Sequence, residues 1–367
     1  MLEQAGYAVG YSGKGWSPGN IQAGGRDRNP AGPRFNNFRD FLNGLTGDRP
    51  FCFWFGSIDP HRPYRKGSGV QSGKNPADVV LPPFLPDAPE VRNDLLDYYV
   101  EIERFDRHVG EILDLLADRQ CLDDTIVVVT SDNGMPFPRG KTNLYDHGSR
   151  MPLAVRWGPS TLGGRILDDF VTLTDLAPTF LEAAGVSAPA QLTGHSLLPL
   201  LQSNKSGRID SRRDRVFLGR ERHGWNRDPN VGYPSRSVRT QAYQYIRNFA
   251  PERWPAFDTD PSPTKDFLLQ NKTADQVHPF FKLWFDRRGS EELYDLKQDP
   301  AQINNLIDRP EYAEVKQRLA QELNDYLKRT RDPRAEGQGD SFDKYRYYSQ
   351  PTGNQKWFKQ FQKELGN

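Results

Sequence analysis

The sequence predicts an α/β domain built on a parallel sheet, followed by a smaller α+β domain. Apolar runs rich in β-branched or aromatic residues, at 51–55 and 126–129, are typical of strands buried on both faces of a parallel sheet. The stretch 91–118 repeats apolar residues at helical spacing, which predicts a long helix. The stretch 169–186 is predicted as a strand, a turn and a helix, with Asp175 as the N-cap of that helix. The part from 206 onward combines short strand-like segments with an amphipathic helix at 312–328, the pattern of an α+β domain.

The length and charge of the chain limit its organisation and its partners. A chain of 367 residues exceeds a typical single domain, and the polar stretch 202–215 is typical of a linker. We therefore expect a larger α/β domain over 1–205 and a C-terminal α+β domain with an aromatic tail over 206–367. The 49 basic and 48 acidic residues form no like-charged block, so no nucleic-acid partner is expected. No apolar run approaches the roughly 18 residues that span a bilayer, so no membrane partner is expected either.

Cysteine usage and the amino-terminal residues add little about the compartment. Cys52 and Cys121 are the two cysteines, too few for a disulfide framework or a zinc site. Cys52 lies inside an apolar run, where packing is the expected role. The first 16 residues lack a basic segment followed by an apolar one, so they are not a signal peptide and resemble the middle of a domain. Localisation and oligomeric state stay unknown from the sequence.

Two early strands each lead to a turn that carries a polar residue. The strand predicted at 7–12 ends at Gly-Lys-Gly, where Lys14 can approach an anionic ligand closely; a solvated loop lysine is the alternative. The strand predicted at 50–57 leads to a Pro-rich turn that contains His61. A lone histidine in such a turn is usually structural.

The strand at 126–130 ends at the most informative segment of the chain. In open α/β sheets, ligands bind just beyond the carboxyl ends of the strands. Asp132 and Asn133 follow this strand directly and offer the hard oxygen atoms that Ca²⁺ or Mg²⁺ prefers. Further on, Lys141 adds a point charge for an oxyanion and Arg150 adds a fork of donors. The alternative is an ordinary turn, because Asn-Gly is a turn dipeptide in any protein.

Four segments of the sequence resemble the type I sulfatases, a family of the alkaline-phosphatase-like superfamily. They read AGYAVGYSGKGW, DPHRP, SDNGMPFPRGKTNLYDHG and ELYDLKQDPAQINNL. The third segment is more similar to the branch of the heparan N-sulfatases (N-sulfoglucosamine sulfohydrolases) than to the arylsulfatases. The resemblance implies an alkaline-phosphatase-like sheet with helices on both faces. It also implies a hydrolase that acts on the sulfuric esters or N-sulfates of a sulfated carbohydrate.

The same resemblance implies roles for individual residues. Asp132 and Asn133 would bind a divalent cation, in this family Ca²⁺. Lys14 and Lys141 would contact the sulfate oxygens, and His61 would contact the sulfate and the leaving-group atom. We expect these side chains to meet at one edge of the sheet. Most of the family has a histidine two places after the first lysine; the residue there is Trp16, which puts one hydrogen bond to the nucleophile in question.

Residues of the C-terminal part are candidates for contacts with the sugar. Arg220 and His223 lie at the end of the strand predicted at 215–220, and we expect them, with Arg150, to bind the substrate. The tail at 342–361 is rich in aromatic and basic residues. It either packs across the large domain or lines a sugar cleft, and the sequence leaves both alternatives open.

Two features of the family are absent from the sequence. The nucleophile of the family is a formylglycine made from Cys or Ser in the pattern C/S-x-P-S/A-R. Pro234-Ser235-Arg236 is the one Pro-Ser-Arg here, and Gly232 stands where the cysteine would be. The early Asp-Asp pair of the metal shell is also absent, since Asp123-Asp124 precedes its strand. We therefore expect an N-terminally truncated chain that lacks its first strand, leaves a sheet edge unpaired and is inactive alone. Coding sequence upstream of Met1 should then contain both motifs.

Two alternative functions remain open at this point. The chain could be a catalytically dead protein that binds sulfated glycans through its lysines, His61 and Arg150. It could also be a phosphoester or phosphonate hydrolase of the same superfamily, because the residues that bind a tetrahedral anion are similar. Binding without sulfate release would favour the first alternative, and cleavage of phosphorus esters the second.

Overall fold

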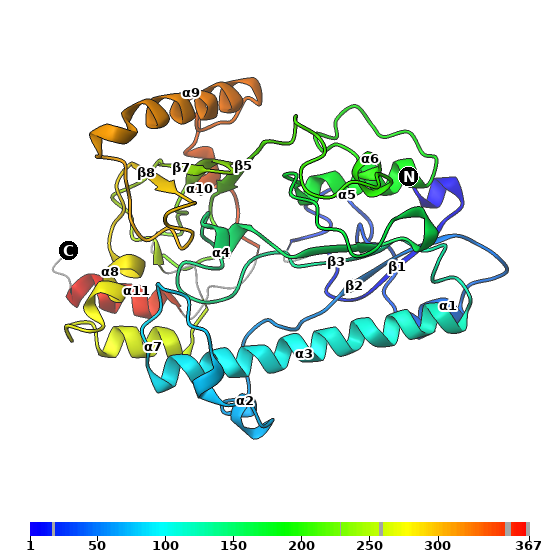
Figure 1. The fold of residues 1–367 in the computed structure, drawn as a ribbon, viewed down its shortest axis with the longest axis horizontal. Helices are drawn as coiled ribbons and strands as arrows, with labels where there is room; N and C mark the ends of the chain where they lie inside the picture. The colour runs from blue at the N-terminus through cyan, green and yellow to red at the C-terminus, as the bar shows by residue number, and fades with distance from the viewer. Residues whose placement is uncertain (17–18, 228, 257–259, 349–353, 365–367) are drawn as a thin grey trace. The chain divides into compact units, whose positions relative to one another are not determined.

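The computed structural model spans the whole chain and forms two compact units. It describes all residues except 17–18, 228, 257–259, 349–353 and 365–367 (Figure 1). The first unit contains residues 1–61, 101–129 and 154–214, and the second contains 62–100, 130–153 and 215–367. These units divide the chain differently from a single boundary at residue 205, so that boundary stays a prediction.

The first unit contains the parallel pair of strands predicted near the amino terminus. β1 (Ala8–Gly13) pairs with β2 (Phe51–Gly56) in parallel, residue for residue from the first to the last. α1 (Phe38–Asn43) packs beside them and is capped by the Asn37 side chain, which accepts a hydrogen bond from the backbone N–H of Asp40 at 2.8 Å. Its aromatic side chains join a buried cluster: Ala8, Phe38, Phe41, Leu42 and Leu116.

The remaining elements after residue 120 follow the predicted order with one exception. β3 (Val127–Thr130) pairs with β4 (Leu153–Arg156) in a second two-stranded sheet. We expected a strand at the start of 169–186, but a 3₁₀ turn, η4 (Leu173–Asp175), forms there instead. Thr172 and Asp175 make a reciprocal capping box at this turn, and α5 (Leu176–Ala183) begins directly after Asp175, the predicted N-cap position.

The second unit contains a four-stranded antiparallel sheet with a helix packed on it. The strands run in the order β5 (Arg215–Arg220), β6 (Ser235–Thr240), β7 (Tyr243–Asn248) and β8 (Glu291–Asp295). α9 (Ala313–Arg329) lies along this sheet (Figure 1). Leu319, Leu323 and Leu327 recur every four residues along α9 and are buried against the sheet, as the helical spacing predicted.

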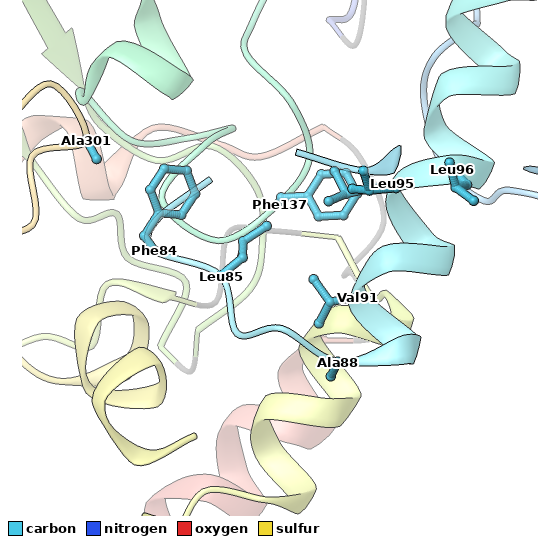
Figure 2. Close-up of a cluster of buried hydrophobic side chains, with 9 residues drawn as sticks. Phe84, Leu85, Ala88, Val91, Leu95, Leu96, Phe137 and Ala301 are labelled. Carbon is cyan, nitrogen blue, oxygen red and sulfur yellow. The ribbon is translucent and has the colours of Figure 1, made fainter. Parts of the chain in front are cut away.

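The 30-residue helix α3 (Pro89–Asp118) supplies its first turns to the core of the second unit. Figure 2 shows Val91 and Leu95 of this helix beside Phe137, which comes from the segment after β3. Phe137 is fully buried, so this contact anchors the loop that carries several of the predicted site residues.

The other elements are short or belong to an aromatic cluster of the second unit. α7 (Pro263–Gln270), α8 (His278–Phe285) and α11 (Asn354–Glu364) bury the rings of Phe281, Phe285 and Phe361 together. No helix in the described part of the chain is long and apolar enough to cross a membrane. The short helices are η1 (Glu3–Ala5), α2 (Ser68–Gln71), η2 (Pro76–Asp78), α4 (Asp146–Ser149), η3 (Gly158–Ser160), α6 (Leu198–Leu201), η6 (Pro310–Tyr312) and α10 (Ser341–Lys344).

Candidate active site

Lys14 lies in the turn directly after β1, and main-chain contacts fix that turn. Its backbone N–H donates to the carbonyl of Gly56 at 2.6 Å, and its own carbonyl accepts from Trp54 Nε1 at 3.0 Å. A Cβ atom on Gly56 would lie 1.7 Å from the Lys14 carbonyl oxygen, so this close approach requires glycine at position 56. The lysine side chain is exposed.

His61 lies in the turn that follows β2, in the same unit. The backbone N–H of His61 donates to the carbonyl of Ile58 at 2.8 Å, and Asp59 accepts from Arg104 of α3 at 3.1 Å. β1 and β2 are parallel and end opposite each other, so both turns leave the same edge of this sheet. The structure therefore brings the segments of Lys14 and His61 to one edge, and both side chains are exposed.

Asp132 and Asn133 lie in a tight turn of the second unit, after β3. Ser131 Oγ donates to the carbonyl of Asn133 at 2.6 Å, and Asn133 Nδ2 donates to the carbonyl of Gly134 at 2.8 Å. Gly134 donates in turn to the carbonyl of Gly148 at 3.1 Å. Asp132 is exposed and Asn133 is half-buried, and these hydrogen bonds fix the turn that carries both residues.

The chemistry of this turn fits part of a cation site. The amide nitrogen of Asn133 is hydrogen-bonded to the main chain. The atoms suited to bind a metal ion are therefore the amide oxygen of Asn133 and the carboxylate oxygens of Asp132. Ca²⁺ takes about six to eight oxygen ligands, so two side chains supply a minority of a complete shell. The described ranges contain no group of three or more His, Cys, Asp or Glu side chains that could hold a metal ion. The binding of Ca²⁺ at this turn stays a prediction.

Lys141 lies on the same loop but is held very differently from Lys14. Its backbone N–H donates to the carbonyl of Met135 at 2.8 Å, which closes the loop on itself. Its side chain is only 6% exposed, and Nζ lies 2.8 Å from a carboxylate oxygen of Asp260. A nearly buried ammonium needs such a partner, because removing an ion from water without one is costly.

Asn143 fixes the turn around Lys141 from both sides. Its amide nitrogen donates to the carbonyls of Gly140 and Lys141, each at 3.2 Å, and its oxygen accepts from Arg288 Nη2 at 2.9 Å. Asn143 is buried, so these contacts exclude water. Arg288 therefore supports the turn from 145 residues away in the sequence.

A buried carboxylate, Glu292 of β8, completes this support. It accepts hydrogen bonds from the hydroxyls of Tyr145 and Tyr294, at 2.6 and 2.7 Å, and from Asn248 Nδ2 at 2.7 Å. Burial raises the pKa of Glu292, but Arg288 and the three donors outweigh it, so the pKa lies below the usual value. Glu292 is therefore ionised in the fold and balances the charge of Arg288.

The three residues predicted to bind the sugar all lie in the second unit. Arg150 follows α4 and is exposed, and His223 is exposed in the loop after β5. Arg220 is buried: its guanidinium lies 5.0 Å from the ring of Tyr233 and donates to the carbonyl of Pro255 at 3.0 Å. Substrate contacts by these residues stay predictions.

The aromatic tail packs inside the second unit where the structure describes it. Phe358 and Phe361 are buried with the aromatic side chains of α8, and the ring of Phe361 lies 5.3 Å from that of Trp254. These contacts favour packing over a sugar-binding role for these two rings. The predicted segment 342–361 includes residues 349–353, which lie outside the described residues.

The partners of Lys141 cannot be predicted from the sequence. Asp260 lies 119 residues after the lysine, and Arg288 lies far beyond the segment that it supports. No motif or local spacing links these residues to the loop. Asn143 lies inside the most informative segment, but its role depends on the fold of the turn.

Comparison with known proteins gives two family models that match overlapping parts of the chain. The model "Sulfatase" matches residues 32–186, and the model "N-sulphoglucosamine sulphohydrolase, C-terminal" matches residues 139–282. Human N-sulphoglucosamine sulphohydrolase is 32% identical over 336 residues, which cover 80% of this chain and 64% of the relative. An ulvan-active sulfatase of Formosa agariphila is 31% identical over 252 residues, 67% of this chain and 40% of the relative. The chain thus spans less than two thirds of the length of these relatives.

Solved structures share the fold at lower sequence identity. One, determined in complex with its substrate D-glucosamine-2-N,6-O-disulfate, matches with a TM-score of 0.61 and 18% identity and covers 94% of this chain and 83% of its own. The phosphonate monoester hydrolase of Silicibacter pomeroyi matches with a TM-score of 0.56 and 18% identity, over 79% of this chain and 59% of its own. These likenesses confirm the predicted α/β fold.

Proposed function

Because the chain belongs to the sulfatase family, we propose that it serves the hydrolysis of a sulfuric ester or an N-sulfate on a sulfated carbohydrate. The observation that supports this most strongly is the loop after β3. It places the oxygen donors Asp132 and Asn133 and the nearly buried ammonium of Lys141 on one fixed segment of the second unit. A cation ligand pair next to a fixed positive charge is suited to a tetrahedral anion.

In this proposal the residues of the chain bind the anion and assist the leaving group. Lys14 and Lys141 neutralise the non-bridging oxygens of the sulfate group as charge develops on them. When the bond from sulfur to the sugar oxygen or nitrogen breaks, His61 gives a proton to the departing atom. Arg150 and His223, which are exposed, bind the sugar, whereas Arg220 is buried.

The reaction of the family also uses a divalent cation and a formylglycine. Asp132 and Asn133 would hold part of the shell of a divalent cation, which supplies Lewis-acid chemistry to the sulfate group. The formylglycine of the family arises from a pattern that the 367 residues do not contain, so no residue of this chain is assigned to the attack.

The names of the relatives support glucosamine-based sulfates as the substrate class. The human relative is an N-sulphoglucosamine sulphohydrolase, and one structural neighbour binds a glucosamine carrying both an N-sulfate and a 6-O-sulfate. The ulvan-active relative acts on a different sulfated polysaccharide. We propose a sulfated amino sugar and leave the choice between N- and O-sulfate to experiment.

Calorimetric titration of the 367-residue chain with D-glucosamine-2-N,6-O-disulfate in the presence of Ca²⁺ tests the proposal. We expect saturable binding that weakens in Lys14→Met and Lys141→Met variants, and ion chromatography of the same samples measures released sulfate. Binding that neither variant changes, or no binding at all, would overturn the proposed site.

A second candidate function is a sulfated-glycan-binding protein without catalysis. It is favoured by the exposure of Lys14, His61 and Arg150, because these side chains can contact a sulfated glycan without cleaving it. Binding in the titration without sulfate release assigns this function to the chain as it stands. Release of sulfate assigns the hydrolase. The phosphonate hydrolase alternative rests on the shared fold alone, and assays with a phosphonate monoester test it.

A further inference from the structure

The ion pair between Lys141 and Asp260 places a negative charge beside the proposed anion site. Lys141 Nζ lies 2.8 Å from Asp260 Oδ2, and the lysine side chain is 6% exposed. The side chain of Asp260 is 26% exposed, so its carboxylate keeps access to solvent and to a ligand. An ion pair between two exposed side chains would contribute little to stability. This one involves a nearly buried lysine on the segment proposed to bind the substrate.

The segment that carries Asp260 is held in place by the core of the same unit. Ser262 caps α7 by accepting from the backbone N–H of Lys265 at 3.1 Å. Thr264 Oγ1 donates to the buried carboxylate of Asp94 at 2.7 Å. Asp94 also binds Arg62 with two hydrogen bonds, at 2.7 and 2.9 Å. The residues that follow Asp260 are therefore anchored, and Asp260 lies beside Lys141 at the start of this anchored segment.

We propose that Asp260 selects against ligands of higher negative charge, so that the site prefers a singly charged sulfate monoester to a doubly charged phosphate monoester. The proposal rests on the proposed function, in which Lys141 contacts the substrate anion. It deepens that function by naming a residue that sets the charge of the accepted substrate. Nothing in the family resemblance assigned a role to this position.

The physical reason is repulsion between two anions that share one ammonium group. An ammonium has three N–H donors in tetrahedral directions, so a ligand oxygen and the Asp260 oxygen would lie roughly 4–5 Å apart. At pH 7 a sulfate monoester carries one negative charge, whereas a phosphate monoester carries about 1.5 to 2. Each additional unit of charge at that distance weakens binding by about fivefold in water, and by more where solvent is excluded.

The test measures the affinities of the 367-residue chain for three ligands by calorimetry at low salt and pH 8. The ligands are glucosamine 6-sulfate, glucosamine 6-phosphate and the methyl ester of glucosamine 6-phosphate. The methyl ester contains phosphorus but carries one negative charge. It therefore distinguishes an effect of the ligand's charge from an effect of phosphorus in place of sulfur. We compare the native chain with Asp260→Asn, which keeps the shape of the side chain, and with Asp275→Asn, an exposed control.

The native chain should bind the sulfate and the methyl phosphate ester more tightly than the doubly charged phosphate. In Asp260→Asn this preference should shrink by about fivefold or more, while Asp275→Asn should leave it unchanged. If Asp260→Asn changes all three affinities equally, Asp260 only positions Lys141 or competes with every ligand for its ammonium group. That result overturns the proposal. Thermal unfolding of each variant confirms that it is folded.

A Lys141→Met variant separates failure of this inference from failure of the proposed function. If the variant binds glucosamine 6-sulfate as tightly as the native chain, Lys141 does not contact the ligand, and the proposed site is wrong. If the variant binds weakly but Asp260→Asn keeps the full preference against the phosphate, only the role of Asp260 is wrong.

Discussion

Lys14 and Lys141, the two lysines proposed to contact the same kind of anion, are held by their units in opposite ways. Lys14 is exposed, and backbone hydrogen bonds between neighbouring strand ends set its position. Lys141 is nearly buried, and side chains from distant parts of the chain set its position. Two equal charges can therefore bind a ligand with different strength, because a charge shielded from water interacts more strongly with it.

The turns of Lys14 and Lys141 also depend on different sets of residues. The turn of Lys14 depends on the close approach of Gly56, a local property of two paired strands. The turn of Lys141 depends on Asn143, which depends on Arg288, which is balanced by the buried carboxylate of Glu292. A change far from the loop can therefore disturb Lys141 without touching it.

Glu292→Ala should give the largest effect, a loss of about 3–5 kcal/mol in the free energy of unfolding. The substitution leaves the buried charge of Arg288 without its balancing carboxylate and leaves the hydroxyls of Tyr145 and Tyr294 without their acceptor. Urea-induced unfolding followed by circular dichroism measures it. Glu311→Ala, at an exposed position, should change stability by less than about 0.5 kcal/mol. Equal effects of the two variants would show that the buried network is unimportant.

Lys141→Met should weaken binding of the glucosamine disulfate by roughly 10- to 100-fold, the value of a lost hydrogen bond to a charged group, about 1.5–3 kcal/mol. The effect should be large because water screens this ammonium little. Calorimetric titration measures it, with the exposed Lys297→Met as the matched control. A loss of less than about threefold would place the ligand away from Lys141.

The stability of the native chain should fall in acid because of Glu292. Its pKa is lowered in the fold, so the unfolded chain binds the extra proton between the two pKa values. The stabilisation is complete above the pKa of an unfolded glutamate, about 4.3, and is lost as the pH falls through the folded pKa. This contribution changes by at most about 1.4 kcal/mol per pH unit. Unfolding of the native chain and of Glu292→Gln between about pH 3 and pH 7 should show a flatter profile for the variant. Parallel profiles would contradict the lowered pKa.

Lys14→Met should give the smallest effect, about 0.5–1 kcal/mol or roughly a two- to fivefold loss of affinity, because the exposed ammonium is screened by water. Its contribution should shrink further between about 0.05 M and about 0.5 M salt, since ions screen exposed charges. The contribution of Lys141 should shrink less over the same range. A Lys14 effect as large and as insensitive to salt as that of Lys141 would remove the distinction between the two sites.

The sequence predicted the parts of the fold that depend on local pattern. β-branched and aromatic runs located β2 and β3, helical spacing located α3 and α9, and the turns of Lys14 and Asp132 follow their strands as expected. The strand expected near residue 170 was wrong because the capping box of Thr172 and Asp175 favours a helical turn.

The site was less predictable where it depends on contacts between distant residues. A carboxylate at position 260 has no feature in the sequence that links it to Lys141, and the pairing exists only once α7 is anchored on Asp94. The same holds for Arg288 and Asn143. These contacts are set by tertiary packing, and local spacing contains no information about them.

A crystal structure of the chain with Ca²⁺ and D-glucosamine-2-N,6-O-disulfate would show whether these residues bind one cation and one sulfate group. We predict that Ca²⁺ contacts the Asp132 carboxylate and the Asn133 oxygen, and that sulfate oxygens lie about 3 Å from the ammonium groups of Lys14 and Lys141. A sulfate group bound elsewhere, or two lysines on different faces of the molecule, would contradict it.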